Sequence, residues 1–232
     1  MCVSAESSFG LTCLLGPVGA YCLKVASERD RSALGIAFIP LGFGIQQFCE
    51  GLVWIGLRHD DLRFARGAAL AYLFFALAFW LFWIPFSARR LESRRWIRLC
   101  LACAAFLGFL GGAVLFVPIL LDPEQLQISV VHHSLTYNYR DPPGLKIAPQ
   151  IVWHLFYLAI ISLPLMLVRH KQLVGYSTAL VVSAVISHAV FWYAFASVWC
   201  LFAAIIALYL GYLFYHWPKS LVGQSEPLPV FT

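Results

Sequence analysis

The sequence places one acidic side chain, Glu50, deep inside a long apolar stretch. An ionised group inside a bilayer is costly, so such residues usually serve a function. Gln46 and Gln47 precede Glu50 by four and three residues, which puts all three side chains on one face of a helix. A carboxylate flanked by two amides suits metal binding, proton transfer or hydrogen bonding between helices.

His154 and His188 also lie inside apolar stretches. Counted from one side of a membrane, these histidines and Glu50 lie about 8–10 Å deep at 1.5 Å per helical residue. One carboxylate and two imidazoles that leave open positions form a ligand set typical of catalytic zinc or iron. The prediction rests on shared depth, because the three residues are far apart in sequence. In the alternative, Glu50 holds helices together and the histidines are amphipathic residues near the headgroups.

The chain has seven cysteines, scattered along its length. An odd number in this arrangement does not fit a disulfide framework. Cys100 and Cys103 form a single CxxC within an apolar stretch, where we expect them to serve packing. Cys2 is different, because removal of the initiator Met would leave an amine and a thiolate on one residue that can chelate a metal or act as a nucleophile. We therefore predict Glu50 and Cys2 as catalytic residues. The alternate metal ligands are Cys2, Cys200 and His133.

The elements that must position these residues follow from composition. The chain has 232 residues, of which 61% are apolar and only 12% charged. A soluble domain carries about 25% charged residues, so soluble, disordered and disulfide-scaffold classes are excluded. Because a bilayer core takes about 20 apolar residues as helix, we predict an all-α integral membrane domain with one turn near 194–197. Its seven predicted spans are 7–23, 33–57, 67–87, 99–121, 147–168, 173–194 and 197–215. Close packing of the fourth span is expected at Gly108 and Gly112.

Cationic residues set the predicted orientation. Placing the N-terminus outside and the C-terminus in the cytoplasm puts eleven of the sixteen Lys and Arg on the inner side. The basic strip from Arg89 to Arg95 lies beside the membrane in this arrangement. Anionic lipid headgroups are therefore its expected partners, rather than nucleic acid.

One long loop, residues 122–146, joins the fourth and fifth spans. Ile128 and Val130, then Leu135, Tyr137 and Tyr139, alternate with polar residues. This period of two predicts a short β-hairpin on the outer face, which reverses near residues 132–134 and serves either as a lid or as a loop cover without a role of its own. Turn residues at 141–144 close the loop.

Three stretches of the chain resemble a family of uncharacterised bacterial multi-pass membrane proteins. The chain opens Met1-Cys2-Val3-Ser4-Ala5, with Val3 where the family has Phe in an MCFSA motif. A QQxxEG motif matches Gln46 to Gly51, and an SVWC motif matches Ser197 to Cys200. The resemblance spans most of the chain and implies no reaction. It points to Cys2, Gln46, Gln47, Glu50, Trp199 and Cys200 as site residues, with Gln46, Gln47 and Trp199 lining a pocket, and to the bacterial cytoplasmic membrane.

These observations leave four functions open. The leading hypothesis is a zinc-, copper- or iron-dependent enzyme that acts on a lipid-like substrate at the outer leaflet, where the metal activates water and a carboxylate moves protons. The second is a seven-helix sensor or a haem- or ligand-binding protein. A retinal Schiff base is disfavoured, since Lys24, Lys146, Lys171 and Lys219 all lie away from the middle of the last span. A transporter and an accessory subunit of a membrane complex are the third and fourth.

Overall fold

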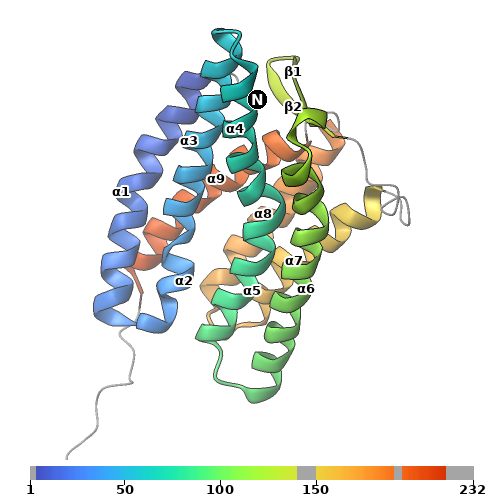
Figure 1. The fold of residues 1–232 in the computed structure, drawn as a ribbon. Helices are drawn as coiled ribbons and strands as arrows, with labels where there is room; N and C mark the ends of the chain where they lie inside the picture. The colour runs from blue at the N-terminus through green and yellow to red at the C-terminus, as the bar shows by residue number, and fades with distance from the viewer. Residues whose placement is uncertain (1–3, 140–149, 191–194, 218–232) are drawn as a thin grey trace, which may run out of the picture.

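The computed structural model describes residues 4–139, 150–190 and 195–217, which form a helical bundle. Within these residues, the predicted all-α architecture is confirmed, with helical segments that run back and forth between two ends (Figure 1). The helices are α1 (Ala5–Arg29), η1 (Arg31–Ala33), α2 (Leu34–Ala37), α3 (Ile39–Arg58), α4 (Leu62–Leu73), η2 (Phe74–Phe79), α5 (Trp80–Leu91), α6 (Arg95–Leu121), η3 (Pro123–Gln125), α7 (Gln150–Leu167), α8 (Lys171–Val190) and α9 (Phe195–Tyr215).

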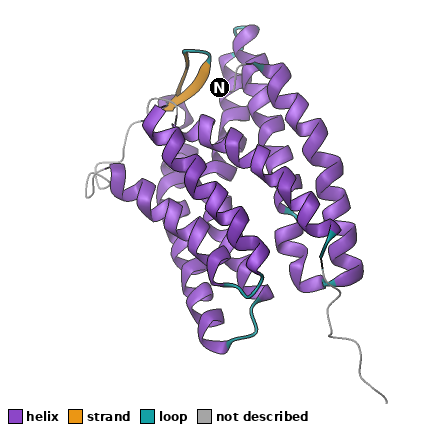
Figure 2. Cartoon of the chain, turned by 180° about the vertical axis from the view of Figure 1, so that it is seen from behind, coloured by secondary structure: helices purple, strands orange, loops and turns teal. Residues whose placement is uncertain are grey.

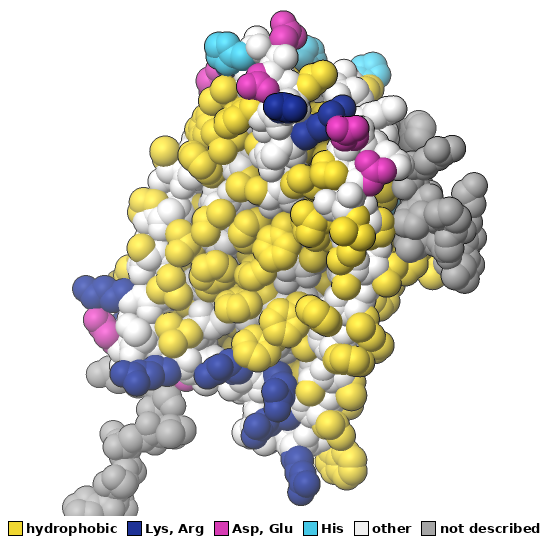
Figure 3. Space-filling view, viewed as in Figure 1, with side chains coloured by type: hydrophobic (Ala, Val, Ile, Leu, Met, Phe, Trp, Pro, Cys, Tyr) yellow, Lys and Arg dark blue, Asp and Glu magenta, His cyan; other side chains and the backbone are white. Residues whose placement is uncertain are grey.

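The surface is that of a protein built to sit in a bilayer. Within the described residues, six helical segments are long and apolar enough to cross a membrane, and Val152–Leu167 is a shorter apolar helix. Hydrophobic side chains cover the middle of the face seen in Figure 3, and charged side chains gather at its two ends. An apolar belt between two polar ends is what a bilayer requires. The composition-based prediction of a membrane protein is supported.

The two ends of the bundle differ in charge. One end, here called the hairpin end, carries the start of α1, the end of α3 and the β-hairpin (Figure 1). Acidic, basic and histidine side chains mix there, and Arg58 forms a bidentate ion pair with Glu6 at 2.6 and 2.9 Å. The opposite end, here called the arginine end, carries the loop between α5 and α6. Lys and Arg predominate on the face of that end seen in Figure 3.

Small residues allow α6 to pack closely on the preceding helix. A Cβ at Gly112 would lie 2.8 Å from the Cα of Ala78, and one at Gly108 would collide with the carbonyl oxygen of Leu81. Both contacts are backbone, so neither neighbour can move aside cheaply. The close approach predicted for the Gly108–Gly112 pair is therefore present, and its partner is the η2–α5 segment.

A π-helical turn, η2, separates α4 from α5. The apolar sequence gave no indication of it, because Phe74–Phe79 carries neither Gly nor Pro. A π-helical turn alters the regular backbone ladder and is frequent at functional sites. The Ala76 carbonyl oxygen within this turn accepts a hydrogen bond of 2.5 Å from the hydroxyl of Tyr157 on α7.

The predicted hairpin is confirmed, with β1 at Gln127–Val131 and β2 at Ser134–Asn138. The two strands pair antiparallel, with Gln127 opposite Asn138, and they form the one sheet of the described residues (Figure 2). The turn consists of His132 and His133, both at positive φ. The predicted closing turn at 141–144 lies outside the described residues.

The last connection differs from the prediction. Helix α8 ends at Val190 and α9 already begins at Phe195, whereas the predicted turn lay near 194–197. The Phe195 ring packs against Trp199, one turn further along α9, with a centroid separation of 5.5 Å, and such a contact supports the first turn of the helix. Residues 191–194 lie outside the described part of the chain.

Candidate functional site

Glu50 is fully buried inside the bundle and accepts hydrogen bonds from neutral donors. Its Oε1 accepts a hydrogen bond of 2.8 Å from the hydroxyl of Ser197 on α9. Its Oε2 accepts one of 3.2 Å from the Nε2 of Gln47, which lies three residues earlier on α3. The three side chains are each at most 1% exposed. Glu50 thus joins α3 to α9 across the apolar core.

The two glutamines beside Glu50 are also fully buried, but each keeps one polar atom without a conventional hydrogen bond. Gln46 accepts at Oε1 from the indole N–H of Trp80, at 2.7 Å. Its Nε2, like the Oε1 of Gln47, has no hydrogen-bond partner among the described residues. Buried polar atoms are normally satisfied, so these two mark a place for water or a polar ligand group.

Cys200 completes this group from α9. The thiol is buried and lies beside the side chains of Gln46 and Tyr72. Sulfur is a weak acceptor and does not replace an oxygen partner for the Gln46 amide. We call Gln46, Gln47, Glu50, Ser197 and Cys200 the Glu50 cluster.

The SVWC stretch, Ser197 to Cys200, forms one turn of α9 that contacts both α3 and α8. Ser197 and Cys200 are three residues apart, so they share a face of the helix and both meet α3. Trp199 points instead to α8, where its indole N–H lies 3.2 Å from the Ser183 hydroxyl and 3.4 Å from the Leu180 carbonyl oxygen. The same turn therefore contributes to the Glu50 cluster and to an adjoining pocket.

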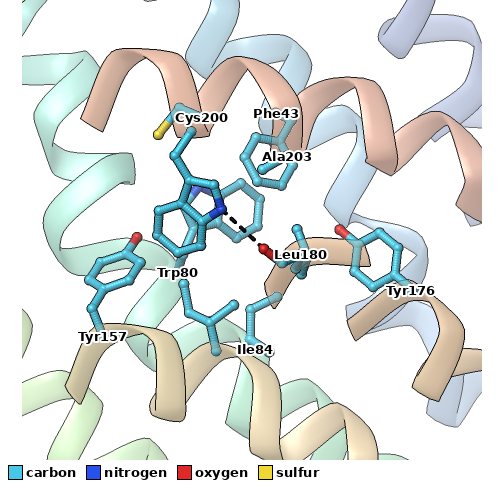
Figure 4. Close-up of a pocket in the computed structure, with 10 residues that line it drawn as sticks. Phe43, Trp80, Ile84, Tyr157, Tyr176, Leu180, Cys200 and Ala203 are labelled. Atoms are coloured by element: carbon cyan, nitrogen blue, oxygen red, sulfur yellow. Dashed lines mark hydrogen bonds between the residues drawn. The ribbon is translucent and has the colours of Figure 1, made fainter. Parts of the chain in front are cut away.

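That pocket is narrow, apolar and rich in aromatic rings (Figure 4). Phe43 and Trp80 stack with their centroids 4.3 Å apart, and Tyr157 meets Trp199 edge-on at 5.3 Å. We call it the aromatic pocket. Its lining residues are Phe43, Trp80, Ile84, Tyr157, Ile161, Tyr176, Leu180, Trp199, Cys200 and Ala203. Trp80 and Cys200 connect the pocket with the Glu50 cluster, since both contact Gln46.

The two histidines meet each other but do not join Glu50. The rings of His154 on α7 and His188 on α8 lie 5.5 Å apart, with Phe195 against both at 4.6 and 5.9 Å. Among the described residues, no group of three or more His, Cys, Asp or Glu lies close enough to hold a metal ion. The predicted set of Glu50, His154 and His188 therefore does not come together. Equal depth fixes height along the bundle, whereas the direction of each side chain depends on helix rotation.

The remaining predicted site residues lie in different parts of the molecule. Cys200 belongs to the Glu50 cluster and Trp199 lines the aromatic pocket, as described above. His133 sits exposed in the turn of the hairpin, where it is not part of a metal-binding group of described residues. Cys2 lies outside the described residues.

Four residues of this region were missed as candidates: Tyr72, Trp80, Tyr157 and Ser197. Trp80 and Tyr157 donate hydrogen bonds inside the bundle, and Tyr72 lies beside the Cys200 thiol. A usable signal existed, because a buried Trp or Tyr inside an apolar span requires a partner for its polar tip. The sequence holds many such aromatics, and only the fold selects these.

Comparison with known proteins identifies the family. A model of a family of unknown function (DUF6629) matches residues 1–222, and the chain belongs to that family. This agrees with the resemblance to an uncharacterised family. No curated protein and no solved structure matches the chain.

Proposed function

We propose that this protein binds a lipophilic small molecule inside the membrane, as a helical sensor or ligand-binding protein without hydrolytic chemistry. The observation that carries the proposal is the pair of unsatisfied amide atoms on Gln46 and Gln47 beside buried Glu50. Leaving such atoms unpaired in an apolar medium costs about 1–3 kcal/mol each. A bound polar group that fills them offsets this cost.

The arrangement favours an amphipathic ligand. The Nε2 of Gln46 needs an acceptor and the Oε1 of Gln47 needs a donor, and a single hydroxyl group offers both. The adjoining aromatic pocket is largely filled by its own side chains. A planar or isoprenoid body would enter it only as these rings move apart, and it would then gain from contact with their faces. A lipid-like alcohol or quinol carries both the polar group and the apolar body that these two parts would contact. A ligand of this kind can enter sideways from the bilayer.

Extraction of the purified protein tests the proposal. The protein is isolated in mild detergent, and bound lipophilic compounds are extracted and identified by mass spectrometry. We expect one compound near a 1:1 ratio to the chain, reduced at least tenfold in Gln46→Leu. Gln172→Leu, an exposed glutamine on α8, is the matched control and should retain it. Bulk membrane lipid alone, in equal amounts in all three proteins, would contradict the proposal.

A metal-dependent enzyme remains a second candidate, and the meeting of His154 and His188 favours it. The Nδ1 of His154 has no hydrogen-bond partner among the described residues, so one imidazole nitrogen is open to a metal. Two imidazoles are fewer than the three protein ligands usual for catalytic zinc. Elemental mass spectrometry tests this candidate. Near one zinc, copper or iron per chain, lost in His154→Ala, would support it, and metal at background would contradict it.

The proposal also includes an orientation. We place the hairpin end outside and the arginine end in the cytoplasm of a bacterial cell, supported by the gathering of Lys and Arg at the arginine end. Glu50 then lies nearer the outer leaflet. Labelling with a membrane-impermeant thiol reagent in intact cells, after Cys is placed at His133 or at Arg90, tests it. Labelling at position 133 alone is expected, and labelling at position 90 alone would reverse the orientation.

A further inference from the structure

The arginine end carries a cationic hollow that the Glu50 cluster does not use. It opens between the end of α5 and the start of α6, and it encloses about 1370 Å³ including space open to the surroundings. Its lining consists of Arg89, Arg95, Trp96, Arg98, Leu99 and Ala102. We call it the arginine hollow. The three arginines and the tryptophan are all exposed.

The nearby acidic residue, Glu92, does not neutralise these arginines. Its Oε2 accepts a hydrogen bond of 2.7 Å from the Nη2 of Arg94, and its Oε1 accepts from the Nε and backbone N–H of the same residue at 2.9 and 2.8 Å. The guanidinium of Arg94 lowers the pKa of the Glu92 carboxyl to about 2, so this partner stays ionised and engaged. The described residues supply Arg89, Arg95 and Arg98 with no carboxylate within ion-pair distance. These three exposed guanidinium groups are therefore open to an anion from outside the chain.

The geometry of α6 indicates what kind of anion this is. Arg98, Leu99 and Ala102 lie three, four and seven residues after Arg95, so the four side chains form one stripe along the helix. The stripe begins with two guanidinium groups and continues as apolar surface toward the membrane. Trp96 beside it is 80% exposed, as is typical of an aromatic side chain at the membrane–water interface. A soluble anion would contact only the guanidinium groups, whereas a lipid would contact the apolar part of the stripe as well.

We propose that the arginine hollow binds the phosphate of an anionic phospholipid, whose acyl chains lie along Leu99 and Ala102. Guanidinium groups bind phosphate oxygens through paired N–H donors, and lysine cannot reproduce this geometry. The first turn of α6 has no side-chain cap, so its backbone N–H groups and helix dipole add to the attraction. This proposal does not depend on what the Glu50 cluster binds.

Native mass spectrometry of the delipidated protein tests the proposal with three probes: phosphatidylglycerol, phosphatidylcholine and glycerol phosphate. We expect phosphatidylglycerol to bind one per chain and at least tenfold more tightly than the other two probes. The triple variant R89K/R95K/R98K keeps the charge, and its affinity for phosphatidylglycerol should fall at least tenfold. Arg31→Gln removes an exposed cation from η1 and is the matched control, with unchanged affinity.

Three results would overturn the proposal. If the lysine triple variant bound phosphatidylglycerol as tightly as the unsubstituted protein, positive charge alone would account for the binding. If Arg31→Gln lost as much affinity for phosphatidylglycerol as the triple variant, the arginine hollow would not be the binding site. Glycerol phosphate binding as tightly as phosphatidylglycerol would assign the hollow to a soluble phosphate ester instead of a lipid. Size-exclusion profiles of the variants that match that of the unsubstituted protein establish that these comparisons concern folded protein.

Discussion

Two buried carboxylates in this molecule are satisfied in different ways. Glu92 at the arginine end is bound by the guanidinium of Arg94, which in turn donates to the Leu167 carbonyl oxygen at the end of α7. Glu50 in the bundle interior accepts from an amide and a hydroxyl. Glu92 therefore ties a surface loop to a helix end. Glu50 accepts from neutral partners, and the Gln46 and Gln47 amides beside it each keep one unfilled hydrogen bond that is available to a ligand.

The comparison predicts that Glu50→Ala has the largest effect. Removal of this carboxylate leaves the Gln47 amide and the Ser197 hydroxyl without their acceptor inside the bundle, where water cannot replace it easily. We expect a loss of about 3 kcal/mol, from about 1–3 kcal/mol for each buried group. Unfolding by denaturant in a fixed mild detergent measures it. Glu50→Gln should recover most of this loss, and equal losses in both variants would show that hydrogen bonding is not the cause.

The next effect concerns α6. Gly108→Ala pushes a methyl group into the Leu81 carbonyl oxygen, so we expect a loss of about 1–3 kcal/mol from overpacking. Gly67→Ala is the control, because a Cβ there meets no other atom within 4 Å. Its small effect should be zero or stabilising, since alanine favours helix. The same denaturant assay separates the two, and similar losses at both positions would contradict the packing described for α6.

The Glu92 side of the comparison predicts a dependence on pH. Because its pKa is lowered from about 4.5 to about 2 by Arg94, the native protein holds fewer protons on Glu92 than the unfolded chain does. The stabilisation from this group is fully present above pH 4.5 and disappears as the pH falls toward 2. Thermal unfolding of the protein and of Glu92→Gln across this range measures it. The difference between the two should shrink with acid, and a constant difference would contradict the ion pair.

The smallest effect is expected from Trp80→Phe. This change keeps an aromatic ring against Phe43 but removes the N–H that donates to Gln46, at a cost of about 1 kcal/mol. Trp83→Phe is the partner experiment, since its N–H donates to the Gly35 carbonyl oxygen away from the Glu50 cluster. Stability should fall similarly in both. Only Trp80→Phe should weaken ligand retention. A similar weakening in Trp83→Phe would show that ligand binding does not depend on the Glu50 cluster.

Much of the fold could be predicted because span length and apolar composition determine it. The pairing of Gln47 with Glu50 followed from a spacing of three residues, and the hairpin followed from alternation around His132 and His133. The direction in which His154 and His188 face could not be predicted, because almost every side of their helices is apolar and no periodicity fixes the rotation. The π-helical turn at Phe74–Phe79 has no sequence signature of its own.

The central claim is that the Glu50 cluster and the aromatic pocket hold a lipophilic molecule, and ligand-linked stabilisation tests it most directly. Thermal unfolding is measured on delipidated protein before and after the extracted lipophilic fraction is added back. A ligand that binds only the native state raises the midpoint with concentration. We predict such a rise for the unsubstituted protein and for Gln172→Leu, and none for Gln46→Leu. An equal rise in all three proteins, or no rise in any, would contradict the claim.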